Sequence, residues 1–163
     1  MREIEVKLAI EGPVELPDFT SDGHGVVEVR ELEPQTLRAT YHDTDDMRLA
    51  HSGISLRRRS GDDGGASWTL KLPLEEGDVV ERRELLFDGN ARSVPAEARG
   101  LLTAHLRSET LRPVARLRTV RKRWLLVGEQ DQELAEISHD TVSLLEGNRV
   151  TARFTEIEIE GRS

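Results

Sequence analysis

The first strand-like segment of the chain alternates charged and aliphatic side chains. Glu3, Glu5 and Lys7 occupy every second position, and aliphatic residues fill the positions between them. In a β-strand, side chains two residues apart lie on one face, so the two carboxylates and the amine share a face. Carboxylates about 7 Å apart along a strand can converge on one cation such as Mg²⁺. The segment therefore predicts half of a metal site.

The last strand-like segment repeats this pattern, with Glu156 and Glu158 alternating with isoleucines. We predict that it forms the opposing wall of the metal site, if the first and last strands are neighbours. Basic residues recur at alternate positions of the segments between these acidic ends: Arg57 and Arg59, Lys71, Arg82 beside Glu84, and Arg116 and Arg118. Arginine presents a planar fork that suits phosphate oxygens. Acids at the ends and arginines between them predict a site for a metal and a polyanion.

The alternative for any single strand of this kind is a half-exposed sheet whose charges face water. A solubilising surface would mix the two signs along each strand, as Arg82 and Glu84 do. Most of the other segments instead carry one sign each. We therefore favour a charged interior.

The elements that must position these residues are mainly strands. Period-two patterns and turn residues predict strands at 2–10, 25–33, 36–42, 54–60, 66–73, 79–88, 113–120, 121–128, 133–138 and 152–160. The Gly-Asp-Asp-Gly-Gly run at 61–65 predicts a hairpin turn. Two helices are expected, at 45–52 after capping candidates at 43–46, and at 94–107, where an apolar stripe has helical spacing. The fold class is mainly β (α+β) and antiparallel.

Length and composition bound the protein further. The 163 residues fit a single domain, 1–163, and the chain contains no cysteine, which excludes disulfides and thiolate metal ligands. A surplus of 31 acidic over 23 basic residues gives a net charge of −8, which argues against a general nucleic-acid binder. The N-terminus lacks the apolar run of a secretion signal, and no stretch approaches the roughly 18 apolar residues of a membrane span. We expect a cytoplasmic protein with neither a membrane nor a nucleic-acid partner.

Taken in order, the motifs resemble the CYTH domain of the triphosphate tunnel metalloenzyme superfamily. The series covers the whole chain: Glu3-x-Glu5-x-Lys7, Tyr41-x-Asp43-Thr44, Leu56-Arg57-x-Arg59, Thr69-Leu70-Lys71, Arg82-x-Glu84, Arg116-x-Arg118, Asp140 and Glu156-x-Glu158. Each motif alone is weak, whereas the ordered series is specific. The resemblance implies an eight-stranded antiparallel β-barrel tunnel with a few flanking helices.

The resemblance also implies a function and a set of site residues. It implies hydrolysis of a triphosphate with Mg²⁺ or Mn²⁺, with inorganic triphosphate foremost and nucleoside or thiamine triphosphates as alternatives. The metal would be held by Glu3, Glu5, Glu156 and Glu158, while Glu84 and Asp140 would bind a second metal or orient the bases. The phosphates would be held by Lys7, Arg57, Arg59, Lys71, Arg82, Arg116 and Arg118. Among these residues, Lys7, Glu5 and Arg57 are the predicted catalytic ones.

Two departures from the family pattern keep other functions open. Some members pair the first-strand lysine with a tyrosine shortly downstream, but residues 8–40 contain none. This leaves a non-catalytic module that binds triphosphate or polyphosphate as the alternative. The chain also has few aromatic residues to hold an adenine, so an adenylyl cyclase of class IV type is a weaker third reading. The arginine-rich segments are similar to those of bacterial chains in which a helical CHAD domain follows, so a C-terminal CHAD domain is an expected partner.

Overall fold

The computed structural model describes residues 2–3, 5–12, 14–21, 23, 25–61, 65–74 and 81–162, with the backbone alone for residues 2, 3, 5, 74, 81 and 82. Within these residues, nine strands and two α-helices follow one another along the chain. They are β1 (Arg2–Glu3), β2 (Glu5–Ile10), β3 (Glu28–Asp43), α1 (Arg48–His51), β4 (Ser55–Gly61), β5 (Ala66–Leu74), β6 (Glu81–Phe87), α2 (Ala96–Leu106), β7 (Arg112–Val127), β8 (Glu133–Glu146) and β9 (Arg149–Gly161), with a short 3₁₀ turn at Glu129–Asp131.

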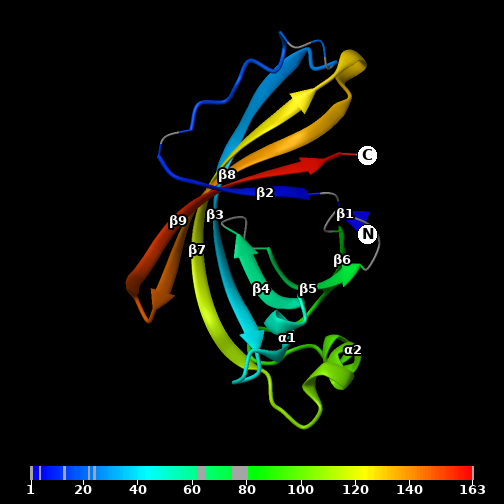
Figure 1. The fold of residues 1–163 in the computed structure, drawn as a ribbon, viewed down its shortest axis with the longest axis vertical. Coiled ribbons are helices and arrows are strands. Elements are labelled where there is room, and N and C mark those ends of the chain that lie inside the picture. The colour runs from blue at the N-terminus through cyan, green and yellow to red at the C-terminus, as the bar shows by residue number, and fades with distance from the viewer. Residues whose placement is uncertain are drawn as a thin grey trace.

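All nine strands belong to one antiparallel sheet in the order β1-β6-β5-β4-β3-β7-β8-β9-β2. The strands at its two edges, β1 and β2, are consecutive in the chain. When these two are counted together, the sheet has eight strands, as predicted. The sheet curls into a tunnel-like shape, with β2 crossing in front of the long strands (Figure 1). This confirms the predicted antiparallel tunnel fold. The sheet is not a continuously paired barrel, since β1 meets β6 through only two residue pairs.

The long strands differ from the sequence-based expectation. The segments 25–33 and 36–42 form one strand, β3, because a register shift between Leu32 and Gln35 accommodates Pro34, which has no N–H to donate. The segments 113–120 and 121–128 also form one strand, β7, since no turn residue separates Val120 from Arg121. The strand expected at 133–138 continues to Glu146 as β8.

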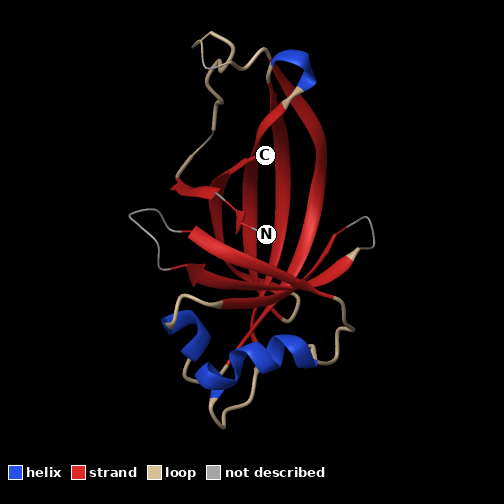
Figure 2. Cartoon of the chain, turned by 90° about the vertical axis from the view of Figure 1, so that its right-hand side faces the viewer, coloured by secondary structure: helices blue, strands red, loops and turns tan. Residues whose placement is uncertain are grey.

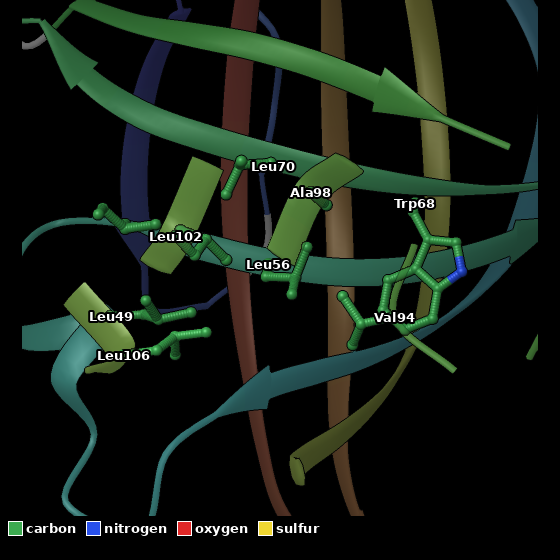
Figure 3. Close-up of a cluster of buried hydrophobic side chains, with 9 residues drawn as sticks. Leu49, Leu56, Trp68, Leu70, Val94, Ala98, Leu102 and Leu106 are labelled. Carbon is green, nitrogen blue, oxygen red and sulfur yellow. The ribbon is translucent and has the colours of Figure 1, made fainter. Parts of the chain in front are cut away.

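The apolar core lies outside the tunnel, between the sheet and the helices. Figure 2 shows α1 and α2 together at one end of the curled sheet. Trp68, Leu70 and Leu56 from β5 and β4 pack with Leu102 and Ala98 of α2, and all five are fully buried (Figure 3). Each large apolar side chain buried in this way stabilises the fold by about 1.5–3 kcal/mol. Since neighbouring residues of a strand face opposite sides, the residues that alternate with this cluster must face the tunnel.

Helix α1 is shorter than the predicted range 45–52, and its backbone is held by the side chain of a residue that precedes it, Asp43. The buried carboxylate of Asp43 accepts hydrogen bonds from the backbone N–H groups of Thr44 (2.7 Å), Leu49 (2.9 Å) and Ala50 (3.0 Å). Gly53, with a φ of 69°, follows the helix where a left-handed residue ends it, as the sequence predicts. Among the described residues, neither helix combines the length and apolar character that crossing a bilayer requires.

Candidate active site

A cavity of about 200 Å³ opens on the inner face of the curled sheet. It is lined by Lys7, Tyr41, Ser55, Arg57, Arg59, Lys71, Glu84, Arg121, Glu136, Ser138, Glu158 and Glu160. Every one of these side chains is polar, and they come from eight different strands, β2 to β9. The charged inner face expected from the alternating motifs is therefore present.

The basic wall of the cavity is formed by β4 and β5. Arg57 and Arg59 alternate with the buried core residue Leu56 and with Arg58, so both point inward. Lys71 is paired with Glu84, Nζ to Oε2 at 3.3 Å. Arg57 donates to the hydroxyl of Tyr41 at 3.4 Å. Neither Arg57 nor Arg59 makes an ion pair with any carboxylate in the described part of the chain.

The electrostatics of this wall follow from its crowding. Burial lowers the pKa of Arg59, and the like charges of Arg57 and Arg121 lower it further. A guanidinium in such a place is stabilised by an added anion, because the anion offsets both the lost hydration and the repulsion. The wall is therefore suited to phosphate oxygens.

The acidic wall is formed by β8 and β9. Asp140 on β8 lies opposite Glu156 on β9, and Glu158 follows two residues later. The carboxylate oxygens of these three residues all lie within 4.8 Å of one another. Asp140 is 2% exposed, so water does little to screen the repulsion between the three negative charges. Such a group needs cations close by.

Two side chains, Arg121 and Lys7, supply this positive charge. Arg121 on β7 contacts Asp140 through two hydrogen bonds, of 2.7 and 2.6 Å, and Glu158 through one of 2.5 Å. Lys7 on β2 donates to Glu156 at 3.0 Å and also pairs with Glu158. Burial alone would raise the pKa of Glu158, but Lys7 and Arg121 outweigh it and lower this pKa. Burial would likewise lower the pKa of Lys7, yet Glu158 and Glu156 raise it above its ordinary value.

The three carboxylates have the chemistry that a hard divalent cation requires. Mg²⁺ and Mn²⁺ bind carboxylate and phosphate oxygens, and Asp140, Glu156 and Glu158 offer such oxygens beside a cavity wide enough for phosphate. A metal ion would compete for these oxygens with Arg121 and Lys7. Glu136, which also lines the cavity, is paired with Arg162 and so is less available.

Most of the predicted site residues lie together. Lys7, Arg57, Arg59, Lys71, Glu84 and Glu158 line the cavity, and Glu156 and Asp140 adjoin it through their ion pairs. For Glu3, Glu5 and Arg82 only the backbone is described, so their side chains lie outside the described residues. The strand register sets Glu5 opposite Glu160 and Glu3 opposite Arg82.

The structure does not bring Arg116 and Arg118 to the cavity. Both are exposed on the opposite face of β7, whereas Arg121 lines the cavity and Arg123, on the same face as Arg121, lies 3.6 Å from the Glu136 carboxylate, so the inward-facing basic residues of β7 are Arg121 and Arg123. The physical reason is the period of two: an odd-numbered shift along a strand moves a side chain to the other face. The run Arg121-Lys122-Arg123 was the available signal, because it precedes the strand that carries Asp140. Tyr41 was also missed as a cavity residue and supplies an aromatic hydroxyl from β3.

Comparison with known proteins places this arrangement in a family. The profile of the CYTH domain family matches residues 1–163. The chain belongs to the CYTH domain family. An uncharacterized protein of Mycobacterium tuberculosis CDC 1551, MT2285, is 36% identical over 141 residues, which are 86% of this chain and 27% of that protein. The same values hold for the uncharacterized protein Rv2226 of strain H37Rv. This CYTH domain therefore spans about a quarter of the length of these relatives.

Solved structures resemble this CYTH domain in fold. A putative adenylate cyclase from Bacillus halodurans superposes with a TM-score of 0.60 at 21% identity, covering 99% of this chain and 82% of that one. The protein PH1819 from Pyrococcus horikoshii OT3 superposes with a TM-score of 0.56 at 17% identity, covering 99% and 78% of the two chains. Both likenesses extend over nearly the whole CYTH domain and support the tunnel architecture.

Proposed function

We propose that this domain hydrolyses a triphosphate with the help of Mg²⁺ or Mn²⁺, and that inorganic triphosphate is its preferred substrate. The observation that supports this most is the pairing of two unlike walls across one cavity. Arg57 and Arg59 make no ion pair with a described carboxylate, although Glu84 and Glu158 act on Arg59 from a longer distance, and both arginines face the wall that carries Asp140, Glu156 and Glu158. One wall suits phosphate oxygens and the other suits the cation that accompanies them.

The proposed reaction needs little covalent participation by the protein. A water oxygen attacks the terminal phosphorus, the bond from that phosphorus to the bridging oxygen breaks, and diphosphate leaves with the bridging oxygen. The proton of the water passes to solvent. Arg57, Arg59 and Lys71 would hold the phosphates and stabilise the negative charge that spreads over them. When bound by Asp140, Glu156 and Glu158, the metal ion would supply further charge neutralisation.

The predicted catalytic Lys7 has a more limited role in this proposal. Its raised pKa, caused by Glu158 and Glu156, keeps the amine protonated at neutral pH. It would therefore act as a positive charge and not as the base that takes a proton from water. The lowered pKa of Glu158 keeps that carboxylate ionised and ready for a cation.

The lining of the cavity bears on the substrate and on the alternatives. Beside Arg57, Lys71 and Glu84 the lining is entirely polar with Tyr41 as its aromatic residue, and beside Asp140 and Glu156 it adds aliphatic side chains and Phe154; the polar part favours recognition by phosphates. A binding module without turnover is the second candidate. The ion pairs of Lys7 and Arg121 favour it, since they neutralise the acidic wall in the absence of a metal.

The test is release of orthophosphate from inorganic triphosphate, ATP and thiamine triphosphate, each with Mg²⁺ or Mn²⁺. We expect Arg59→Gln to lower kcat/KM by about 10²–10³-fold, because it removes a charged donor to the transferring group. Glu158→Gln should raise the metal concentration needed for half-maximal rate. Arg92→Gln, an exposed arginine outside the cavity, is the matched control and should change neither.

The products separate the candidate functions. Orthophosphate that appears only with metal supports the triphosphatase. Pyrophosphate released from ATP without orthophosphate would indicate a cyclase and contradict the proposal. Tight triphosphate binding that Arg59→Gln weakens, without release of any product, would leave the binding module. A single domain over 1–163 and a following CHAD domain stay predictions.

A further inference from the structure

Five arginines form a patch on the outer face of the sheet, opposite the cavity. The outer arginine patch consists of Arg38, Arg58, Arg116, Arg118 and Arg153. Arg38 lies directly opposite Arg118, and Arg153 lies opposite Ser143, the other neighbour of Arg118. Thr40 lies between Arg58 and Arg116 in the same way. The adjoining residues on these strands, such as Arg57 and Phe154, line the inner side.

The outer arginine patch is not neutralised by the protein. Arg38, Arg116, Arg118 and Arg153 are exposed, and none of the five takes part in an ion pair with a described carboxylate. The Nε of Arg58 is buried without a hydrogen-bond partner. Some accessible arginines outside the patch do pair with acids: Arg30 with Glu28 and Asp131, Arg48 with Asp46, and Arg149 with Glu146.

This absence of acids is not explained by composition. The chain carries 31 acidic and only 23 basic residues, so five arginines side by side with no acid among them are not what its composition predicts, although single exposed arginines such as Arg92 and Arg99 also make no ion pair with a described carboxylate. Neighbouring strands are about 4.8 Å apart and alternate residues of one strand are about 7 Å apart, which places adjacent guanidinium groups of the patch, such as those of Arg38 and Arg118, within a Debye length of each other. Their mutual repulsion is relieved when an anion with several charges binds.

We propose that the outer arginine patch binds an extended chain of linked phosphates, such as inorganic polyphosphate. The patch spans the strands from β4 to β9, a distance of about 19 Å at 4.8 Å for each strand, which is longer than a single phosphate ester requires. Arginine forks bind phosphate oxygens in pairs. Two half-buried side chains among them, Thr40 and Ser60, offer hydroxyl donors to the same oxygens.

The same surroundings disfavour other polyanions. Single-stranded nucleic acid is held in part by stacking of its bases on aromatic side chains, and the positions between these arginines carry threonine and serine instead. An acidic peptide gains most of its affinity from large apolar or aromatic anchors in pockets, and the exposed apolar side chains beside Arg116 and Arg118 on β7 are the small valines Val114 and Val120. A phosphate chain needs only charge and hydrogen bonds. This proposal concerns the face opposite the cavity and does not depend on the proposed hydrolysis.

The test measures binding of a medium-chain inorganic polyphosphate by calorimetry, without divalent metal and with excess inorganic triphosphate to fill the cavity. The patch variant is Arg38→Gln with Arg153→Gln, and the control is Arg92→Gln with Arg99→Gln, which removes the same charge from exposed positions elsewhere. We expect the patch variant to bind at least tenfold more weakly and the control less than twofold more weakly. The slope of log affinity against log salt should fall by about 1.5–2 in the patch variant, since two phosphate contacts are lost.

A conservative variant and two rival ligands complete the test. Arg38→Lys with Arg153→Lys keeps the charges and should retain affinity within a few fold. An equal loss in the patch and control variants would show that only net charge matters, and it would overturn the proposal. Unchanged binding in the patch variant would place the long chain elsewhere and overturn it as well. Tighter binding of a single-stranded oligonucleotide or of poly-glutamate to the wild type would refute the assigned ligand.

Discussion

The clearest test of the cavity's electrostatics is the replacement of Arg121 by methionine. Arg121 makes two hydrogen bonds to Asp140 and one to Glu158, and its side chain is 16% exposed. Among the described residues, it is the only side chain that donates to the carboxylate of Asp140, which is 4% exposed. Arg121→Met keeps most of the side-chain volume and removes the charge. The variant therefore leaves a buried carboxylate without a partner.

The magnitude follows from this loss of a partner. Removing one member of a buried ion pair destabilises a protein by about 3–5 kcal/mol. Glu158 keeps its ion pair with Lys7, so the cost arises mainly at Asp140 and should lie near the lower limit, about 3 kcal/mol. For a domain of this length, 1 kcal/mol corresponds to about 2–4 °C in Tm. We expect Tm to fall by about 6–12 °C.

The matched control is Arg123→Met, on the same face of the same strand. The Nε of Arg123 lies 3.6 Å from the Glu136 carboxylate, which is longer than a hydrogen bond, and Glu136 keeps Arg162. This variant should cost less than about 1 kcal/mol. Urea unfolding gives both free energies, and the double variant Arg121→Met with Asp140→Asn should recover part of the loss, since no buried charge is then left unpaired.

Divalent cations provide the second half of this prediction. Without Arg121, three carboxylates face only Lys7, so Mn²⁺ or Mg²⁺ should bind the folded variant more tightly than the wild type. By mass action, saturating metal should then raise the Tm of Arg121→Met more than that of the wild type. The reasoning would be refuted by equal costs for the two methionine variants, or by metal that stabilises the wild type and Arg121→Met equally.

Four further predictions concern ionisation, packing and helix anchoring. The raised pKa of Lys7 means that its stabilisation is fully present below pH 10.5 and is lost as the pH rises through the higher folded value, so urea unfolding of Lys7→Met and wild type should converge only in strong alkali. The lowered pKa of Glu158 has the opposite sign: its stabilisation is present above pH 4.5 and is lost as the pH falls through the folded value, so Glu158→Gln and wild type should converge in acid. Trp68→Phe removes a hydrogen bond of 3.0 Å from the indole to the Asn90 carbonyl and leaves a cavity, so it should lower the free energy of unfolding by about 2–3 kcal/mol, measured by thermal unfolding. Asp43→Ala leaves three backbone N–H groups without their acceptor and should lower it by at least about 3 kcal/mol in the same assay.

The sequence predicted the fold class and most of the cavity because the information is local. Alternation over a few residues assigns Arg57, Arg59 and Lys71 to one face, and the antiparallel tunnel follows from the strands and turns. The pairing of strands is not local. Which residues of β7 lie opposite Asp140 depends on the register of β7 with β8, and the sequence of residues 112–127 alone does not determine that register. Arg116 and Arg118 were therefore as plausible from sequence as Arg121.

The acidic cluster was predicted in part for a similar reason. Glu156 and Glu158 are recognisable from their own strand, and Asp140 was predicted for a second metal or an orienting role, whereas grouping it with the two glutamates requires the pairing of β8 with β9. The tyrosine that the resemblance implies was sought at residues 8–40, downstream of Lys7. Tyr41 reaches the cavity from the adjoining position because β3 runs alongside β4, opposite Arg57.

The location of the apolar core explains how a tunnel with charged walls can stay open. Burying ion pairs costs about as much hydration free energy as their attraction returns, so the cavity contributes little net stability. The stabilising contacts lie outside it, where Trp68, Leu70 and Leu56 pack against α2. The same strands thus place their apolar residues on the helices and their charged residues around the cavity. A change in the cavity therefore destabilises the domain only where, as in Arg121→Met, it leaves a buried charge without a partner.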